Sequence, residues 1–272
     1  MLSRLPARFY GDFLMGSRLG AYRNLLVSAL EAGYRVCSLG SLWGAITDGN
    51  LDPERRLFVL RHDVDTDPRT AAAMSEIDRE LGIESTYLFR LSTAAIGIMA
   101  RIADAGSEVS YHYEELSTIA KRRGLHDLES ALAHLPEARD HFAENIRRLR
   151  AASGLPMRVV AAHGDFINRR LGLSNSVILA DAAFRKAVDV DLDAYDDDFL
   201  RQLPDRFTDV AHPTYWEPAD PGAAILAGTR RISVLVHPRH WRVDRWANAR
   251  DDLRRVVEGL SFEVRIGGRR HS

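Results

Sequence analysis

Short apolar runs alternate along the chain with segments whose apolar residues recur every three to four positions. Several of the runs are continuous, as expected for strands that are buried on both faces of a parallel sheet. They predict strands at Arg35–Leu39, Leu57–Arg61, Ser85–Phe89, Glu108–Tyr111, Arg158–Ala162, Ile232–Val236 and Phe262–Ile266. The helical periodicity predicts helices at about Gly20–Gly33, Pro68–Leu81, Ala94–Ala105, Leu128–Ala152 and Asp244–Leu260.

Strands that alternate with helices indicate βαβ units and a parallel sheet. Glycines follow four of the helical patterns directly, where a C-terminal cap is expected: Gly33, Gly82, Gly106 and Gly154. We therefore predict an α/β fold, a (β/α) barrel that spans residues 1–272 as a single domain. Residues 1–50 are expected to form a helical extension outside the barrel. The aspartate-rich and proline-rich stretch 181–220 is expected to be an insertion or an irregular section of the barrel near the site.

The amino-acid composition indicates which binding partners and which cellular compartment suit the protein. The chain has 272 residues, of which 46% are hydrophobic, enough for one large core. Its 37 basic and 38 acidic side chains give a formal net charge of −1, so nothing favours nucleic acid or an anionic membrane. No stretch reaches the roughly 20 apolar residues of a membrane span. Arg4, Arg8 and Asp12 interrupt the start of the chain before a signal peptide could form, and one cysteine, Cys37, excludes an intrachain disulfide. These features favour a cytoplasmic protein.

Four histidines lie at equivalent positions relative to the predicted strands. His62, His112, His163 and His237 all lie at or just past the C-terminal end of a predicted strand. In (β/α) barrels this rim carries the chemistry. A single histidine at a strand end is more often structural than a ligand, but four such placements among ten histidines are hard to attribute to packing alone.

The first cluster, Leu60–Pro68, ends an apolar strand with three carboxylates at alternate positions. In an extended backbone Asp63 and Asp65 point to the same side, so one can bind a cation while the other stays free as a base. Asp67 before Pro68 predicts a helix N-cap. Capping needs only one carboxylate, so it leaves Asp63 and Asp65 unexplained.

Two further clusters also follow strands. His112 precedes Glu114 and Glu115, which either contribute to a metal site or form the charged first turn of a helix. His163 precedes Gly164, which permits a sharp turn or the close approach of a substrate.

In the last cluster, Pro238 fixes the backbone directly after His237. Trp241 offers an apolar face of the kind on which sugars stack, and packing against the barrel is an equally good interpretation of it. The candidate substrate-binding residues of the four clusters are Arg61, Glu114, His240 and Trp241.

Two histidines and one carboxylate are a common donor set for zinc or a similar divalent ion, with a water in the open position. The metal lowers the pKa of that water and polarises a carbonyl. A separate carboxylate can then accept the water proton, and a histidine can protonate the leaving amine. The sequence therefore contains the residues needed for metal-assisted amide hydrolysis.

The clusters resemble, in order, the motifs of the polysaccharide deacetylase family (NodB homology, carbohydrate esterase family 4). His62-Asp63-Val64-Asp65 looks like the first motif, in which the first aspartate is the catalytic base and the second binds metal. Glu108–His112 looks like the strand that leads to the family's His-x-x-x-His ligand pair. Leu235-Val236-His237 looks like the late Leu-x-His motif, whose histidine acts as acid.

The resemblance covers roughly Leu57 to Trp241 and implies a (β/α) barrel that is distorted or seven-stranded. It also implies Asp63 as base and His237 as acid. A departure concerns the metal ligands, because Leu116 stands four residues after His112, where the family has its second histidine. The third motif, usually arginine and proline, reads Ala-His-Gly-Asp here.

We infer that His163 supplies the missing ligand from across the barrel mouth. The predicted metal ligands are then Asp65, His112 and His163, with zinc as the default ion and cobalt, nickel or manganese as alternatives.

The pattern also resembles a divergent branch found among surface-polysaccharide biosynthesis proteins. This implies removal of an N-acetyl or other N-acyl group from a sugar of lipopolysaccharide, O-antigen or capsule, with lipid-linked and nucleotide-linked forms both open. Two alternatives remain. One is another amidohydrolase, such as a deformylase. The other is a catalytically degenerate carbohydrate-binding or regulatory protein on the same scaffold, which Leu116 favours.

Overall fold

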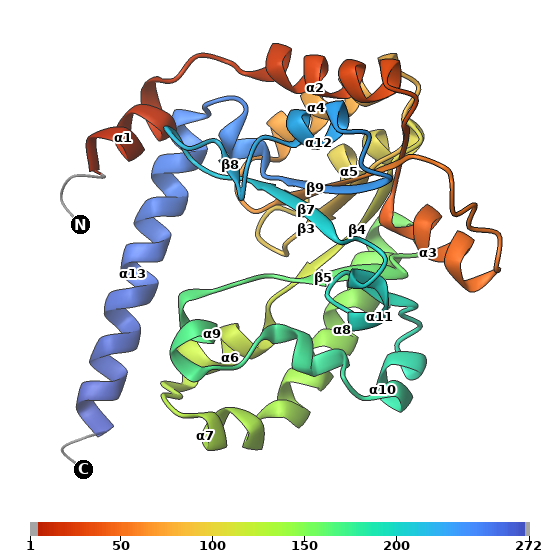
Figure 1. Cartoon of the computed structure of the whole chain (residues 1–272). Coiled ribbons are helices and arrows are strands. Elements are labelled where there is room, and N and C mark those ends of the chain that lie inside the picture. Colours follow the sequence, from red (N-terminus) through yellow and green to blue (C-terminus); the bar gives the residue numbers. More distant parts are fainter. Residues whose placement is uncertain (1–4, 270–272) are drawn as a thin grey trace.

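The computed structural model describes residues 5–269, in which helices surround a curled sheet and one long helix, α13, runs along one side (Figure 1). The strands are β1 (Arg35–Cys37), β2 (Leu57–Val64), β3 (Thr86–Phe89), β4 (Glu108–Tyr113), β5 (Val159–Ala162), β6 (Leu192–Asp193), β7 (Asp205–Asp209), β8 (Trp216–Glu217) and β9 (Arg231–Val236). Six of the seven predicted strands are confirmed with small shifts of their ends, and the seventh, Phe262–Ile266, is wrong.

The longer helices are α2 (Leu19–Glu31), α3 (Leu39–Thr47), α4 (Pro68–Glu80), α5 (Ile96–Asp104), α6 (Glu115–Arg123), α8 (Leu135–Ser153) and α13 (Arg245–Arg269). The shorter ones are α1 (Leu5–Phe9), α7 (Leu128–Ala133), α9 (Phe166–Leu171), α10 (Ala182–Ala187), α11 (Asp197–Leu200) and α12 (Pro221–Leu226), with a π-helical turn η2 (Tyr10–Leu14) and 3₁₀ turns η3 (Asn175–Leu179) and η4 (Pro238–His240). None of the described helices combines the length and the apolar character that a membrane span needs.

The sheet is an open half-barrel. Its strands follow the order β6-β5-β4-β3-β2-β9-β7-β8, and β1 pairs with the first half of β2. Every neighbouring pair from β6 to β7 is parallel, which makes seven parallel strands side by side, and β8 is antiparallel at one end. Within residues 5–269 the two ends of this path do not pair with each other. The predicted distorted (β/α) barrel is therefore confirmed.

Burial on both faces explains why β2 reads as a continuous apolar run. All eight of its residues are buried. Leu57 and Val59 belong to a small cluster with residues of the neighbouring strands, whereas Phe58 and Leu60 belong to the large core that also contains residues of the surrounding helices. Consecutive residues of a strand point to opposite faces, so the side chains of one strand contribute to both cores. The same alternation leaves polar residues at the end of β2 pointing into the mouth of the half-barrel.

The apolar run Phe262–Ile266 lies inside α13 and not in a strand. Phe262 is fully buried, whereas Val264, two residues later, is largely exposed, as expected when a helix turns one side chain inward and the next ones outward. A short apolar run cannot be assigned by periodicity alone. The predicted helix Leu128–Ala152 is divided into α7 and α8 at His134, directly before the Leu135-Pro136 start of α8.

The two segments that were expected to depart from the regular barrel pattern also contribute strands to the sheet. Residues 1–50 supply β1 as well as helices, and β1 pairs with β2. Residues 181–220 supply β6, β7 and β8, and β7 lies beside β9 in parallel. The sequence of β7, Asp205-Arg206-Phe207-Thr208-Asp209, has one large apolar residue and is mostly exposed at its start, so hydrophobic patterning does not reveal it.

Helix α3 contacts β4 through Gly40 and Glu108, and a second glycine of α3, Gly44, provides a control for this contact. Gly40 N–H donates to Glu108 Oε2 at 3.1 Å, and Glu108 also accepts from Thr86 Oγ1 at 2.7 Å. A Cβ at Gly40 would lie 2.3 Å from Glu108 Oε1, whereas nothing lies within 4 Å of one at Gly44. In Gly40→Ala, Glu108 must rotate away from its hydrogen bonds, each worth about 0.5–1.5 kcal/mol.

We therefore expect Gly40→Ala to be less stable than Gly44→Ala by about 1–2 kcal/mol, because only the first loses hydrogen bonds and Gly44, in the interior of α3, gains at least as much helix propensity. Urea unfolding of the two variants measures this difference. Equal stabilities would show that Glu108 does not hold α3 in place.

Candidate functional site

The side chains predicted to carry the chemistry meet at one rim of the sheet. Asp63 lies in β2 with Asp65 just after it, His112 lies in β4, and His163 and His237 follow β5 and β9. The parallel register sets β2 beside β9, with His62 opposite Val236, and sets His112 opposite Ala161. Because parallel strands end at the same edge, the sequence pattern places these side chains together.

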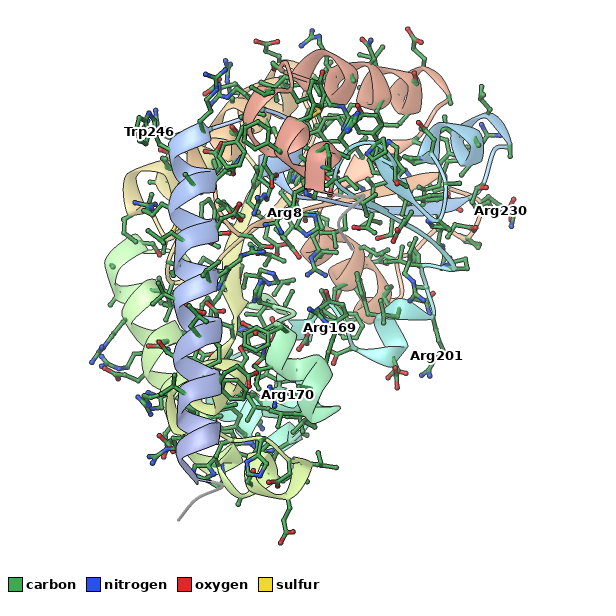
Figure 2. All side chains as sticks on the ribbon, turned by 90° about the vertical axis from the view of Figure 1, so that its left-hand side faces the viewer. Arg8, Arg169, Arg170, Arg201, Arg230 and Trp246 are labelled. Atoms are coloured by element: carbon green, nitrogen blue, oxygen red, sulfur yellow. The ribbon has the colours of Figure 1, made fainter. Side chains whose placement is uncertain are left out.

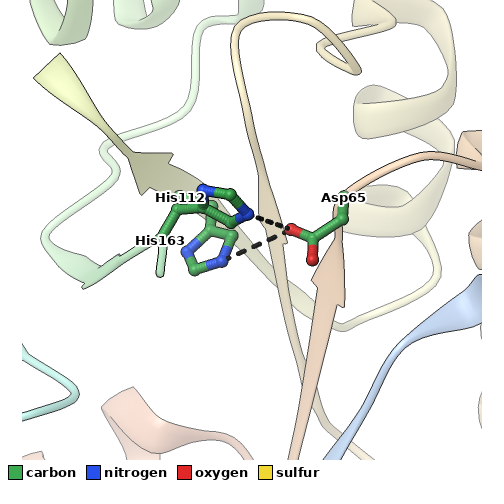
Figure 3. Close-up of side chains that lie close together, drawn as sticks. All are labelled: Asp65, His112 and His163. Atoms are coloured by element: carbon green, nitrogen blue, oxygen red, sulfur yellow. Dashed lines mark ion pairs between the residues drawn. The ribbon is translucent and has the colours of Figure 1, made fainter. Parts of the chain in front are cut away.

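Asp65, His112 and His163 form a compact group that could hold a metal ion (Figure 3). Asp65 Oδ1 lies 3.5 Å from His112 Nε2 and 3.6 Å from His163 Nε2. This oxygen is buried and has no hydrogen-bond partner. Burial alone would raise the pKa of Asp65, but His163 and His112 hold it well below its ordinary value. A buried anionic oxygen that faces two imidazole nitrogens without a hydrogen bond fits the donor set of a divalent cation.

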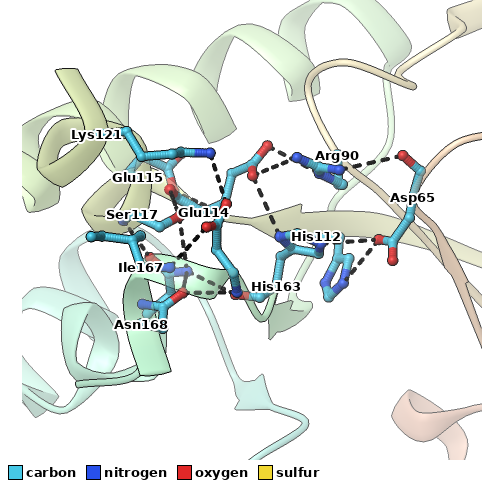
Figure 4. A network of polar contacts seen from close by, with 12 residues as sticks. Asp65, Arg90, His112, Glu114, Glu115, Ser117, Lys121, His163, Ile167 and Asn168 are labelled. Carbon is cyan, nitrogen blue, oxygen red and sulfur yellow. Dashed lines mark hydrogen bonds and ion pairs between the residues drawn. The ribbon is translucent and has the colours of Figure 1, made fainter. Parts of the chain in front are cut away.

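Neighbouring groups contact both imidazoles, and Figure 4 shows Glu114 between Arg90 and the ring of His163. His112 Nδ1 lies 2.9 Å from the carbonyl oxygen of Ala161, and this contact directs Nε2 towards Asp65. Burial lowers the pKa of His112 to about 4, so its ring is neutral at physiological pH, as a metal ligand must be. His163 Nδ1 lies 3.4 Å from Glu114 Oε2, and Arg90 holds Glu114 through contacts of 3.0 and 2.6 Å.

Asp63 is a buried carboxylate beside this group. Arg61 donates to both of its oxygens, at 2.7 and 2.8 Å, and Asp63 Oδ2 lies 3.3 Å from His112 Nε2. Burial would raise the pKa of Asp63, but the charge of Arg61 and its hydrogen bonds lower it below its ordinary value. Asp63 therefore stays ionised at neutral pH. Arg61, a predicted substrate contact, is buried and also donates to the hydroxyl of Tyr195 at 3.2 Å. Its contacts make it a positioning residue for Asp63.

His237 is held by an aspartate that the sequence analysis missed. Asp209, the last residue of β7, lies with its Oδ1 2.6 Å from His237 Nδ1, and its Oδ2 accepts from the His237 backbone N–H at 2.9 Å. Burial would lower the pKa of His237, but Asp209 raises it to about 9. The ring is thus protonated at neutral pH, and its Nε2 lies 4.0 Å from Asp65 Oδ2. This arrangement suits a proton donor at the site.

The remaining predicted substrate contacts differ in their access to the site. Trp241 is only 1% exposed, donates to Asp209 Oδ2 at 2.7 Å and packs edge-on against Tyr22 and Trp216, so no sugar can stack on its face. The interpretation of Trp241 as a residue packed on the barrel is the correct one. His240 Nδ1 lies 3.2 Å from Asp209 Oδ1. Glu114 lies at the metal group but is engaged by Arg90.

Three other residues from the clusters serve the fold. His62 is fully buried, contacts the hydroxyl of Tyr22 at 2.8 Å and stacks on Tyr87. Leu116, where the resembling family has a histidine, is fully buried in the core. Asp67 accepts from the backbone N–H of the first turn of α4, which confirms the predicted N-cap.

Two other groups of side chains also have suitable spacing for a metal ion, but their carboxylates are occupied. These groups are Asp209, His237 and His240, and Glu114, His163 and Asp165. Asp209 accepts from Trp241, Glu114 accepts from Arg90, and Asp165 accepts from Lys121 at 2.7 Å. The group with the free carboxylate oxygen, that of Asp65, is therefore the best candidate among the described residues.

Comparison with known proteins finds no protein-family model and no curated protein that matches the chain. Among solved structures, it is similar to a carbohydrate esterase family 4 pseudoenzyme from Bacillus anthracis, with a TM-score of 0.41 and 14% identity over 79% of this chain and 66% of that one. It is similar to the peptidoglycan deacetylase PdaC from Bacillus subtilis, with a TM-score of 0.34 and 14% identity over 81% and 96% of the two chains. A family 4 carbohydrate esterase from Streptomyces lividans, solved with acetate, has a TM-score of 0.34 and 11% identity over 78% and 88%.

Proposed function

We propose that the protein is a metal-dependent hydrolase that removes an N-acetyl or other N-acyl group from a sugar. The observation that carries the proposal is the free, buried Oδ1 of Asp65, which faces the imidazoles of His112 and His163. Next to it lie an ionised carboxylate, Asp63, and a protonated histidine, His237. A cation site with a separate base and acid is what amide hydrolysis requires.

Asp65, His112 and His163 would hold the metal ion. Two imidazole nitrogens and one carboxylate oxygen suit zinc, and also cobalt, nickel or manganese. When bound, a divalent ion there would polarise an acyl carbonyl and lower the pKa of a water. Leu116 removes one ligand of the resembling family, and the position of His163 beside Asp65 supports the replacement inferred from the sequence.

Asp63 and His237 are the proposed base and acid. Asp63 is kept ionised by Arg61 and can accept a proton from the attacking water. His237 carries a proton that Asp209 stabilises, and its Nε2 can donate this proton to the departing sugar nitrogen. Arg61 favours the anionic form of Asp63 and Asp209 favours the cationic form of His237, so the two groups carry opposite charges at the same pH.

The substrate class rests on the motif resemblance. The resembling branch belongs to surface-polysaccharide biosynthesis, and we propose an N-acylated sugar of lipopolysaccharide, O-antigen or capsule. The alternative of a catalytically degenerate carbohydrate-binding protein rests on Leu116. Acid release from N-acylated sugars by the metal-loaded protein distinguishes the two.

The metal site makes a direct prediction for binding stoichiometry. We expect the wild-type protein to hold about one divalent ion per chain. Asp65→Ala, His112→Ala and His163→Ala should each lose most of it, because each removes one of three ligands. Mass spectrometry of the desalted protein measures the metal content. His141→Ala, which changes a partly exposed histidine of α8 that pairs with Glu137, is the matched control and should keep the ion. Full stoichiometry in His163→Ala would show that another residue completes the site, and Glu114 and His240 would be tested next.

A further inference from the structure

The C-terminal helix α13 is fixed against the rim that carries the metal group. Glu258 of α13 accepts from Lys121 of α6 at 2.8 Å, and Glu263 pairs with Arg170 of α9 at 2.5 Å. The rings of Phe262 and Phe166 lie 5.9 Å apart. These contacts on α6 and α9 set one face of α13 beside the site.

A pocket of about 250 Å³ lies between α9, α13 and the metal group. Asp65 and His163 belong to its lining, so it opens onto the reacting centre. Four arginines also line it, from the loop after β3, from α9 and from α13: Arg90, Arg169, Arg254 and Arg255. Figure 2, which views the molecule from the α13 side, labels Arg169 and Arg170 close to this helix.

The three acidic residues in the lining are already committed to other contacts. Asp165 and Glu258 both pair with Lys121, at 2.7 and 2.8 Å. Asp65 faces His112 and His163. The carboxylates that line the pocket therefore do not balance all of its arginines.

The arginines themselves differ in how they are engaged. Arg90 is held by Glu114 and Arg255 by Asp251, the latter at 2.8 Å. Arg169 has no ion pair within residues 5–269, and its side chain is exposed to the pocket mouth. Arg254 is partly engaged, because its Nη2 donates to Asp251 Oδ1 at 3.3 Å, but its buried Nε has no hydrogen-bond partner and lies 3.6 Å from Glu258 Oε1. The guanidinium of Arg169 and the Nε of Arg254 thus offer N–H donors that the protein does not satisfy.

We propose that this pocket binds an anionic group of the substrate, a phosphate or a carboxylate on the sugar whose acyl group is cleaved. Guanidinium groups present several N–H donors in a plane, a geometry that matches phosphate and carboxylate oxygens. The pocket volume is below the roughly 300–1,000 Å³ of sites that enclose a whole drug-sized ligand, so it suits one charged substituent or one ring. The inference rests on the proposed function and narrows its substrate class from N-acylated sugars to acidic ones.

The test compares three probes on zinc-loaded protein by isothermal titration calorimetry: N-acetylglucosamine, its 1-phosphate and an N-acetylated hexosaminuronic acid. A hydrogen bond to a charged group contributes about 1.5–3 kcal/mol, so we expect an acidic probe to bind at least about tenfold more tightly than the neutral sugar. This preference should weaken in high salt. Arg169→Ala and Arg254→Ala should each reduce it severalfold. Arg201→Ala, which changes an exposed arginine paired with Asp198 outside the pocket, is the matched control and should not.

The same titrations and an assay of released acid separate this inference from the proposed function. Equal binding of neutral and acidic probes would overturn it, and so would a preference that both pocket variants retain. An arginine-dependent preference without acid release would support the anion pocket and contradict the hydrolase. Equal release from neutral and acidic sugars would support the hydrolase and overturn the anion pocket.

Discussion

Replacing Asp63 with asparagine is expected to lower kcat by about 10²–10⁴-fold while the metal content stays unchanged, because a positioned general base contributes about that factor. The asparagine side chain has nearly the same shape but cannot accept the proton of the attacking water. Its amide oxygen can still accept one hydrogen bond from Arg61, so the local structure should be kept. Turnover per bound metal ion in the two proteins measures the effect.

The contrary interpretation of Asp63 is structural, since Arg61 contacts both of its oxygens. If that pairing is its only role, Asp63→Asn would lower the free energy of unfolding and leave turnover per metal nearly intact. Urea unfolding and turnover measured on the same sample therefore decide between a base and an anchor for Arg61.

Replacing Asp209 with asparagine is expected to reduce kcat at pH 8 by about 10²-fold or more, because His237 loses the charge that keeps it protonated. Without Asp209 the burial of His237 is opposed only by the more distant charges of Asp65 and Asp63, so its pKa should fall well below about 9. The alkaline limb of the kcat profile should then move to lower pH. Partial recovery of activity in the variant below pH 6 would separate loss of the proton from loss of structure. An unchanged alkaline limb would contradict the role of His237 as acid.

The ion pair between His237 and Asp209 should also make the free energy of unfolding depend on pH. Because the folded-state pKa of His237 is raised to about 9, its pairing with Asp209 stabilises the fold fully below the unfolded pKa of about 6.5. This contribution is lost as the pH rises through about 9. Wild-type protein should therefore lose more stability than Asp209→Asn between pH 6 and pH 10.

The placement of the main site residues could be predicted because their strands are continuous apolar runs and each ends in a polar cluster. In a parallel sheet such ends meet at one rim, so Asp63, Asp65, His112, His163 and His237 come together. His62 shows the limit of the rule. Its side chain alternates to the outer face of β2 and packs on Tyr87.

Asp209 could not be predicted because β7 has little hydrophobic pattern and lies in a stretch with many other aspartates. Only the pairing of β7 with β9 sets it beside His237. The Arg61–Asp63 pair, in contrast, could have been predicted from the sequence, because residues two apart in a strand lie on the same face. Whether Trp241 binds substrate or packs in the core depends on how far its side chain is buried, and the residues next to it in the sequence do not determine this.

The most direct test of the proposed function is acid release as a function of metal occupancy. Metal-free protein is titrated with zinc in the presence of N-acetylated sugars, neutral and acidic, and the released acetate is measured. We predict no release without metal, and a rate that rises with occupancy and saturates near one ion per chain. A protein that binds one ion at Asp65, His112 and His163, yet releases no acid from any N-acylated sugar, would contradict the hydrolase and favour a carbohydrate-binding role.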